Sequence, residues 1–475
     1  MNLYNGKQLR NAKQRVNLPF CLSLDGTDDV LNCDRLLNII QGKRAVLSGI
    51  WGNHKVVAKL FFKPLQINRH IRREASGIRA LSRAGVPTPD LLFTGKTKDK
   101  EIGVLLFKYI YPSEELGEVW NKVESTQEKR NLIRKLMVIL AKMHQAGIKH
   151  LDLHLNNFLV KNNTIYTIDG TPIKWDKKGR PLKLRDRLKN LALLFAQFTL
   201  PDYFLVCDLY AEYVKASGLE NEKNIFEELQ LRIERWRRWR IRNYIKLNSR
   251  EYSELVCRKS FTRFMLCKRA YYKPAMASFL DNPDKIINDP KNLFLKRGNS
   301  STVIRIKIDN YDLVVKRYNI KNFRHRLRRF FRATRATHSW QSAHRLLKLG
   351  IATPMPVAIL ERRFGYFRGR AYFAYEYIDG PNIIDYFKNG DLDKKLDVAR
   401  RIADIFKNLK IARISHHDMK GTNIIINQGH PVLLDLDAMR MHINRRRFEH
   451  AHKRDIKNFL ENWQDAPRVL NFFKI

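Results

Sequence analysis

The sequence predicts an α+β fold of two tandem domains, each with a β-rich N-terminal lobe and a helical C-terminal lobe. One observation is the order of patterns, because strand-like runs precede a helix, a polar motif and further amphipathic helices, and this order occurs twice. The other is that three residues of the motif recur at a constant offset of 266 positions: Asp152 and Asp418, Asn157 and Asn423, and Asp169 and Asp435. Two copies of one framework are the simplest account.

Length and the position of turn residues set the expected domain boundaries. A chain of 475 residues with 44% hydrophobic residues is long enough for two separate cores. Two prolines and several polar residues between 281 and 292 are typical of a linker. We therefore expect a first domain at 1–280, with its motifs in 41–170, and a second at 293–475, with its motifs in 295–437.

Cysteine usage and hydropathy exclude several protein classes. The five cysteines are an odd number without CxxC or metal-ligand spacing, which argues against a disulfide framework and fits a reducing compartment. The N-terminus lacks an apolar signal-peptide region, and no run of about 18 apolar residues occurs. We expect neither secretion nor a membrane-spanning segment.

The net charge is unusually positive. Ninety Lys and Arg residues against 47 Asp and Glu residues leave a formal charge of +43. Such an excess favours an anionic partner, namely nucleic acid, an anionic membrane face or an acidic substrate. A solvated basic surface without a specific partner is the alternative.

The first copy begins with a strand and a helix that together predict an ion pair. Residues 1–40 show no chemistry and stay unassigned, whereas 45–61 alternate as a β-hairpin that ends in Val-Val-Ala-Lys. Lys59 there is a candidate to neutralise nucleotide phosphates. Glu74, 15 residues later on a predicted helix, can hold that lysine in place. A solvated edge lysine and a surface glutamate are the alternatives.

The polar run 150–157, His-Leu-Asp-Leu-His-Leu-Asn-Asn, is typical of the catalytic loop of a kinase. In such a loop an aspartate, here Asp152, accepts the proton of the attacking hydroxyl, and an asparagine, here Asn157, holds a metal ion. The strand-like run 164–168 then leads to Asp169, a second carboxylate for magnesium. Lys, Glu, the Asp–Asn loop and a second Asp follow one another in the order that a protein-kinase-like fold with ATP and Mg²⁺ requires.

Two segments support this loop without contributing chemistry. The apolar run 102–110 predicts a buried strand leading into a hinge where adenine can dock. Apolar residues at helical spacing in 128–147 predict a helix under the loop. Because no cysteine or carboxylate stands at metal spacing from His144, we interpret this histidine as a packing or capping residue.

The second copy repeats most of this pattern. A turn of small residues at 295–303 precedes the strand lysine Lys316, and the facing helix is expected at 340–349. Ser339 stands where the helix glutamate should be, so the expected ion-pair carboxylate is missing. A weak, regulatory or substrate-binding domain is one interpretation. The other is an active domain, favoured because the catalytic and metal-binding residues Asp418, Asn423 and Asp435 are retained, with Asp437 as a further carboxylate.

These residues resemble those of the bacterial lipopolysaccharide kinase family, which includes inner-core heptose kinases and 3-deoxy-manno-octulosonic acid kinases. The resemblance rests on His-x-Asp-Leu-His-x-x-Asn-Phe at 150–158, Ile-Asp-Gly at 168–170, Arg-Glu-Ala at 73–75 and the turn 84–89. It implies a two-lobed kinase that phosphorylates sugars of the lipopolysaccharide inner core with ATP and magnesium. By this resemblance Lys59, Glu74 and Lys316 would position ATP.

The resemblance covers most of 40–250 and 290–460, and one absence agrees with it. A protein kinase has an activation loop and an Ala-Pro-Glu element after its second Asp, whereas here Gly170 leads quickly to a helix at 188–195. Little room is left to grip a peptide. An aminoglycoside-like or protein kinase is an alternative, and a pseudokinase scaffold that binds lipid or nucleic acid is another.

Basic segments suggest where such an enzyme would work. Arginines alternate with Ile233, Trp236 and Trp239 on a predicted helix, which suits anionic headgroups, substrate phosphates or nucleobases, or else buries its Trp face as core. Two further basic stretches lie in the second half, at Arg324, Arg326, Arg328, Arg329 and Arg332 beside Phe330 and Phe331, and at Arg445–Arg447 with Lys453 and Arg454. We expect a cytoplasmic protein associated peripherally with the anionic inner membrane, an acidic lipopolysaccharide precursor as partner and no specific nucleic acid.

Overall fold

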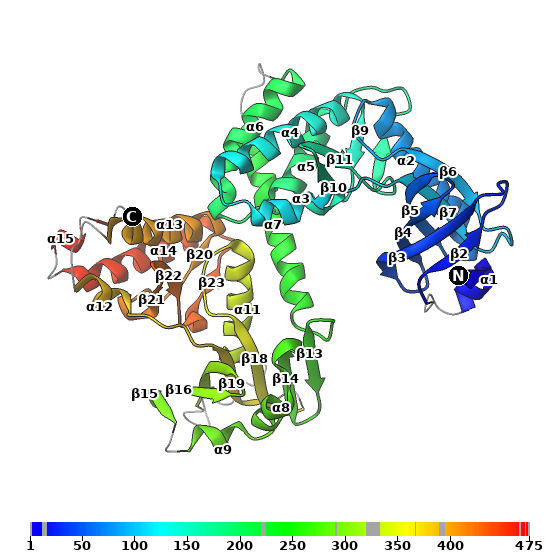
Figure 1. The fold of residues 1–475 in the computed structure, drawn as a ribbon. Helices are drawn as coiled ribbons and strands as arrows, with labels where there is room; N and C mark the ends of the chain where they lie inside the picture. Colours follow the sequence, from blue (N-terminus) through cyan, green and yellow to red (C-terminus); the bar gives the residue numbers. More distant parts are fainter. Residues whose placement is uncertain are drawn as a thin grey trace. The chain divides into compact units, whose positions relative to one another are not determined.

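The chain folds into two compact units (Figure 1). The computed structural model describes residues 2–11, 17–219, 225–289, 292–319, 333–365, 367–388, 395–464, 467–470 and 472–473. The first unit comprises 1–197 and 204–236, and the second comprises 198–203 and 237–475. The boundary therefore lies within helix α7 (Ile225–Leu247) and not in the expected linker at 281–292, part of which forms helix α9 (Pro283–Ile287).

The N-terminal lobe of the first unit is a seven-stranded sheet. Its strands, in spatial order, are β1 (Asn2–Tyr4), β2 (Phe20–Ser23), β3 (Val30–Ile40), β4 (Arg44–Trp51), β5 (His54–Phe61), β7 (Gly103–Lys108) and β6 (Leu91–Lys96). Neighbouring strands are antiparallel except β1 and β2. The predicted hairpin at 45–61 and strand at 102–110 are confirmed, and residues 1–40, unassigned from sequence, supply three more strands.

Helices and short sheets complete the first unit. Helix α2 (Ile67–Arg83) packs on β6 and β7, and its buried face includes Ile71, Ile78 and Leu81. The helical lobe contains α3 (Leu116–Lys122), α4 (Thr126–Gln145), α5 (Leu184–Phe195) and α6 (Phe204–Ser217). Beside them lie the small sheets β8 (Glu114–Glu115), β10 (Phe158–Lys161) and β11 (Thr164–Thr167), and β9 (Ile148–His150) with β12 (Ile173–Trp175). The predicted catalytic loop joins β9 to β10.

The second unit repeats this architecture around its own antiparallel sheet. The spatial order is β13 (Leu255–Lys259), β14 (Arg263–Lys268), β18 (Pro356–Phe364), β19 (Phe367–Glu376), β17 (Tyr311–Tyr318), β16 (Ser301–Ile308) and β15 (Leu293–Arg297). Five strands of this sheet, in the order β15-β16-β17-β19-β18, repeat the order β3-β4-β5-β7-β6 of the first unit. Each sheet has two further strands, and these extend opposite edges of the shared five-stranded arrangement. In the first unit β1 and β2 extend the edge at β3, whereas in the second unit β13 and β14 extend the edge at β18. This pairing draws 255–268 into the second unit and moves the boundary upstream.

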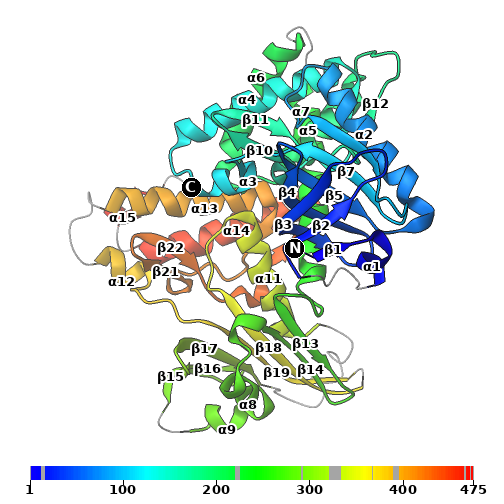
Figure 2. The same cartoon turned by 45° about the vertical axis from the view of Figure 1, so that its right-hand side comes forward.

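The helical lobe of the second unit lies on one side of its sheet in both views (Figures 1 and 2). It contains α12 (Ile383–Lys388), α13 (Leu396–Ala412) and α14 (Arg445–Leu460), the hairpin β21 (Ile424–Asn427) and β22 (His430–Leu433), and the pair β20 (Ile414–Ser415) and β23 (Arg440–Met441). Helix α11 (Arg335–Leu349) contacts β18 and β19, and its Trp340 lies in the core. The predicted fold class of two tandem kinase-like domains is confirmed.

Helix α7 does not sort its tryptophans and arginines as the sequence suggested. Trp239 is 50% exposed, whereas Arg237 is buried, with its guanidinium carbon 4.6 Å from the centre of the Tyr203 ring. A helix that simply buries its Trp face is therefore a wrong description of this segment, because an arginine takes the buried position instead. The basic stretch with Arg324, Arg326, Arg328, Arg329, Phe330, Phe331 and Arg332 lies outside the described residues. None of the helices that the structure describes is long and apolar enough to cross a bilayer.

Candidate active sites

The strand lysine of the first unit lies in a network of carboxylates. Because side chains alternate along a strand, Ala58 and Leu60 enter the sheet's core while Lys59 points to the other face. Its ammonium group pairs with Glu74 of α2 and lies 3.0 Å from Asp169 Oδ1. The predicted Lys59–Glu74 ion pair is confirmed. Burial lowers the pKa of Lys59, but the charges of Glu74 and Asp169 outweigh it and raise the pKa, so the lysine remains cationic.

Glu74 connects the helix to the segment that follows Asp169. It is fully buried and accepts the backbone N–H groups of Gly170 (3.0 Å) and Thr171 (2.7 Å), as well as the Thr171 hydroxyl. The close approach depends on glycine, since a Cβ on Gly77 would lie 2.0 Å from the carbonyl oxygen of Gly170. The carboxylate thus fixes strand, helix and loop in one arrangement.

The loop between β9 and β10 presents Asp152 to solvent. The side chain of Asp152 is 72% exposed, and Nε2 of His154 lies 3.7 Å from its carboxylate. Asn157 donates its amide to the backbone carbonyl of Asp152 at 2.7 Å, which leaves the amide oxygen of Asn157 as an available ligand. The loop can therefore offer a base to an acceptor and an oxygen to a metal ion.

Asn190 of α5 holds the base of this loop. Its oxygen accepts the backbone N–H of His150 at 3.3 Å, and its amide donates to the His150 carbonyl at 2.6 Å. The same oxygen lies 3.1 Å from Nε2 of the buried His144, whose Nδ1 contacts the Tyr213 hydroxyl at 2.8 Å. The interpretation of His144 as a packing residue is confirmed. Asn190 was not found from sequence, because one asparagine on a helix carries no local signal.

Asp169 lies two residues after the end of β11 and has a left-handed conformation with φ of +79°. Such a conformation is unusual outside glycine, although aspartate adopts it more readily than most residues, and it is found at turns and at functional sites. Burial raises the pKa of Asp169, but Lys59 and, to a smaller extent, Arg44 lower it by more, so that the net shift is downward and the group is a carboxylate. Arg44, at 3.7 Å, was not predicted as part of the site.

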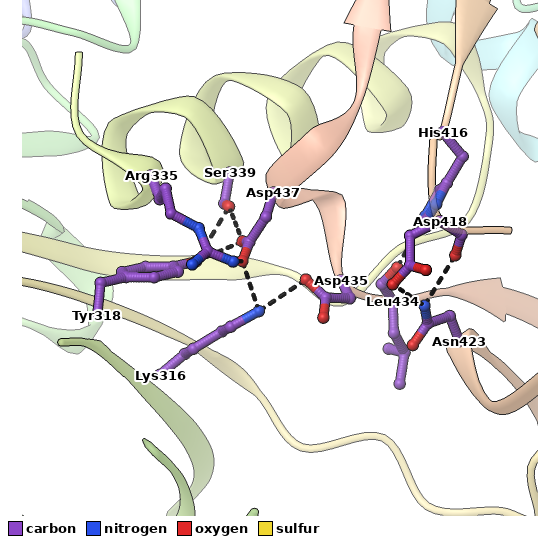
Figure 3. Close-up of polar contacts among 10 residues, drawn as sticks. All are labelled: Lys316, Tyr318, Arg335, Ser339, His416, Asp418, Asn423, Leu434, Asp435 and Asp437. Atoms are coloured by element: carbon purple, nitrogen blue, oxygen red, sulfur yellow. Dashed lines mark hydrogen bonds and ion pairs between the residues drawn. The ribbon is translucent and has the colours of Figure 1, made fainter. Parts of the chain in front are cut away.

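The second unit holds a related but rearranged site (Figure 3). Lys316 of β17 lies 2.6 Å from Asp435 and 2.7 Å from Asp437. Ser339 of α11 donates its hydroxyl to Asp437 at 2.7 Å. The helix glutamate is absent, as expected, but the inference that the lysine therefore lacks an ion-pair carboxylate is wrong, because Asp437 reaches it from the loop.

The second candidate catalytic loop matches the first. Asn423 donates to the backbone carbonyl of Asp418 at 2.9 Å, and Asp435 is again left-handed with φ of +52°. Lys420 lies 2.8 Å from the Asp418 carboxylate. Burial raises the pKa of Asp418, but the hydrogen bond and charge of Lys420 lower it overall. Buried Asp455 of α14 takes the place of Asn190, since it accepts the backbone N–H groups of His416 (2.6 Å) and His417 (2.8 Å).

A cavity of about 360 Å³ adjoins the second lysine. Its lining combines apolar side chains, among them Val303 and Phe373, with Lys316, Asn423 and Asp435. An apolar pocket with a few convergent polar groups is the usual form of a small-molecule site, and this volume lies within the usual range for such sites.

The oxygen donors of both sites fit magnesium. Mg²⁺ takes carboxylate and amide oxygens and commonly uses one or two protein ligands together with nucleotide phosphates. Asn157 and Asp169 provide such a pair in the first unit, and Asn423 and Asp435 provide it in the second. In the part of the chain that the structure describes, no group of three or more His, Cys, Asp or Glu residues could hold a metal ion by itself.

Comparison with known proteins agrees with this geometry. A family model described as the lipopolysaccharide kinase (Kdo/WaaP) family matches residues 48–217 and 279–468. Over 114 residues the chain is 34% identical to a probable serine/threonine-protein kinase, the BUD32 homolog of Archaeoglobus fulgidus. That match covers 24% of this chain and spans about half, 51%, of the relative.

Proposed function

The chain belongs to the lipopolysaccharide kinase (Kdo/WaaP) family, and from this premise we propose that it is an ATP-dependent kinase that phosphorylates sugar hydroxyls of the lipopolysaccharide inner core. The observation that supports this most strongly is the paired lysine, carboxylate and Asp–Asn loop, present in both units. The family match and the similarity to a probable protein kinase both support a kinase. That the acceptor is a sugar of the lipopolysaccharide core is our more specific proposal.

In the first unit the roles follow from position and charge. Lys59, kept cationic by Glu74 and Asp169, binds the α and β phosphates of ATP. Asp152, exposed beside the site, orients the acceptor hydroxyl and accepts its proton as the acceptor oxygen bonds to the γ-phosphorus of ATP, while the bond from that phosphorus to the bridging oxygen breaks and ADP leaves. Asn157 and Asp169 would hold magnesium, and the bound ion would supply neutralisation of the charge on the phosphate oxygens.

In the second unit the same roles fall to equivalent residues. Lys316 would bind the phosphates, Asp418 would accept the proton, and Asn423 and Asp435 would hold the metal. Lys420, 2.8 Å from Asp418, keeps that carboxylate ionised. Two working sites are therefore the proposal.

The segment after Asp169 favours a small acceptor over a peptide. Ile173 to Trp175 form β12, which pairs with β9 directly beside the catalytic loop, and α5 begins at Leu184. The short connection leaves Asp152 open and provides little surface for an extended chain. A protein acceptor is the second candidate, favoured by the probable serine/threonine-protein kinase among the relatives.

The proposed place of action is the anionic inner face of a membrane, where an acidic lipopolysaccharide precursor would be met. Helix α14 begins with Arg445, Arg446 and Arg447, all exposed, and Ile443 just before it is 80% exposed. Exposed arginines beside an exposed aliphatic side chain suit an interface of anionic headgroups and acyl chains. Peripheral association of an otherwise cytoplasmic enzyme is the form of binding that we propose.

The test is phosphate transfer from labelled ATP to purified, phosphatase-treated lipopolysaccharide core. We expect Asp152→Asn and Asp418→Asn each to lose part of the transfer and the double variant to lose nearly all of it. Asp404→Asn, an exposed change on α13, serves as the matched control. Loss with Asp152→Asn alone would make the second unit an accessory. No transfer by the unchanged protein to this acceptor, with transfer to a protein acceptor, would replace the sugar proposal.

A further inference from the structure

We propose that Asp437 is the positioning residue of Lys316 and that the second unit thereby keeps a complete nucleotide-binding set despite lacking the helix glutamate. This inference rests on the proposed function and identifies how its second site is built. It assigns to Asp437 the role that Glu74 has in the first unit.

The two sites differ by an exchange of a carboxylate and a hydroxyl. In the first unit the helix supplies the carboxylate, Glu74, and the segment after Asp169 supplies the hydroxyl, Thr171. In the second unit the helix supplies the hydroxyl, Ser339, and the segment after Asp435 supplies the carboxylate, Asp437. Each hydroxyl donates to its carboxylate, and each carboxylate pairs with the strand lysine.

Sequence positions agree with this correspondence. Thr171 and Asp437 are 266 residues apart, the same offset as the catalytic residues. Ser339 and Glu74 stand equally far, 11 positions, before Gly350 and Gly85 after their helices. The residues at these two matched positions therefore preserve the contact between the hydroxyl and the carboxylate. What differs is that the helix provides the carboxylate in the first unit and the hydroxyl in the second.

The contacts of Asp437 fit a positioning role and not a metal ligand. Its side chain is only 7% exposed. Oδ1 accepts the hydroxyls of Tyr318 (2.6 Å) and Ser339 (2.7 Å), and Oδ2 contacts Lys316 (2.7 Å) and Arg335 (2.6 Å). These four partners occupy both oxygens, since each carboxylate oxygen has about two lone-pair sites.

Asp435 is placed differently. Both aspartates line the cavity, but the side chain of Asp435 is 29% exposed whereas that of Asp437 is 7% exposed. In Figure 3 it lies between the group around Asp437 and the loop with Asp418 and Asn423. The metal-binding role thus stays with Asp435, and Asp437 fixes the lysine behind it.

An exchange of the two groups tests the inference. In the full chain with Lys59→Met, which weakens the first site, we compare Asp437→Asn, Ser339→Glu with Asp437→Thr, and the exposed control Asp404→Asn. The readouts are the affinity for magnesium–ATP, the KM for ATP against kcat, and thermal unfolding. Removing a charged hydrogen-bond partner corresponds to a loss of roughly 10- to 100-fold in affinity.

We expect Asp437→Asn to weaken magnesium–ATP binding by that factor, the double exchange to restore it to within a few-fold, and the control to leave it unchanged. Unaltered binding by a folded Asp437→Asn variant would overturn the inference. So would a folded double exchange that fails to recover, because a metal ligand or a purely structural carboxylate would not be replaced from the helix. If the parent binds magnesium–ATP but transfers phosphate to no lipopolysaccharide acceptor, the proposed acceptor fails while the binding data still decide the role of Asp437.

Discussion

Removal of the Glu74 carboxylate should both destabilise the first unit and weaken its nucleotide site. Glu74→Ala leaves the N–H groups of Gly170 and Thr171 without their acceptor and takes one of two anions from Lys59. Breaking a buried ion pair from one side costs about 3–5 kcal/mol. Because Asp169 stays 3.0 Å from the lysine, we expect the lower end of that range.

For a unit of this size, each kcal/mol lowers Tm by about 2–4 °C, so a cost of about 3 kcal/mol lowers it by roughly 6–12 °C. Scanning calorimetry of the full chain measures this change in Tm. Because α2 belongs to the first unit, the loss of hydrogen-exchange protection in α2 identifies the transition of that unit. Magnesium–ATP affinity should fall in the same variant.

The matched control is Arg73→Ala, one position earlier on the same helix and exposed. A surface change of this kind usually stays within about 0.5 kcal/mol. If Glu74→Ala unfolded like the control and kept its nucleotide affinity, the carboxylate would not hold strand, helix and loop together, and our account of the site would be wrong.

Burial lowers the pKa of His144 to about 4, below its ordinary value. The neutral imidazole therefore contributes stability that is fully present above about pH 6.5 and is lost as the pH falls towards 4. The free energy of unfolding should fall by about 3 kcal/mol over this range. Urea unfolding at both ends of this range should show a smaller pH dependence for His144→Asn than for the exposed control His54→Asn, and equal dependence would contradict the assignment. Replacing Arg445, Arg446 and Arg447 by Gln should weaken binding to anionic vesicles by about 1 kcal/mol per arginine and leave neutral vesicles unaffected. If the unchanged protein ignored anionic vesicles at low salt, the membrane proposal would be lost.

Sequence determined the parts of both sites that depend on local pattern. Alternation along 45–61 predicted the strand of Lys59, and the position of Glu74 on a predicted helix 15 residues after that lysine predicted their ion pair. The 266-residue offset located Asp418 and Asn423 as counterparts of the first loop. Strand and helix patterns can be read from the sequence because the period of each element brings residues that are close in sequence to a common face.

Tertiary structure decided which distant groups meet. Lys316 and Asp437 are 121 positions apart, and no periodicity links them. Because Ser339 stands where the helix glutamate was expected, the sequence suggested that the carboxylate was missing, whereas the loop provides it. In the same way, the pairing of β14 with β18 moved the unit boundary into α7. Pairings of this kind depend on the packing of whole elements against one another, and that information lies in three-dimensional contacts and not in the order of residues along the chain.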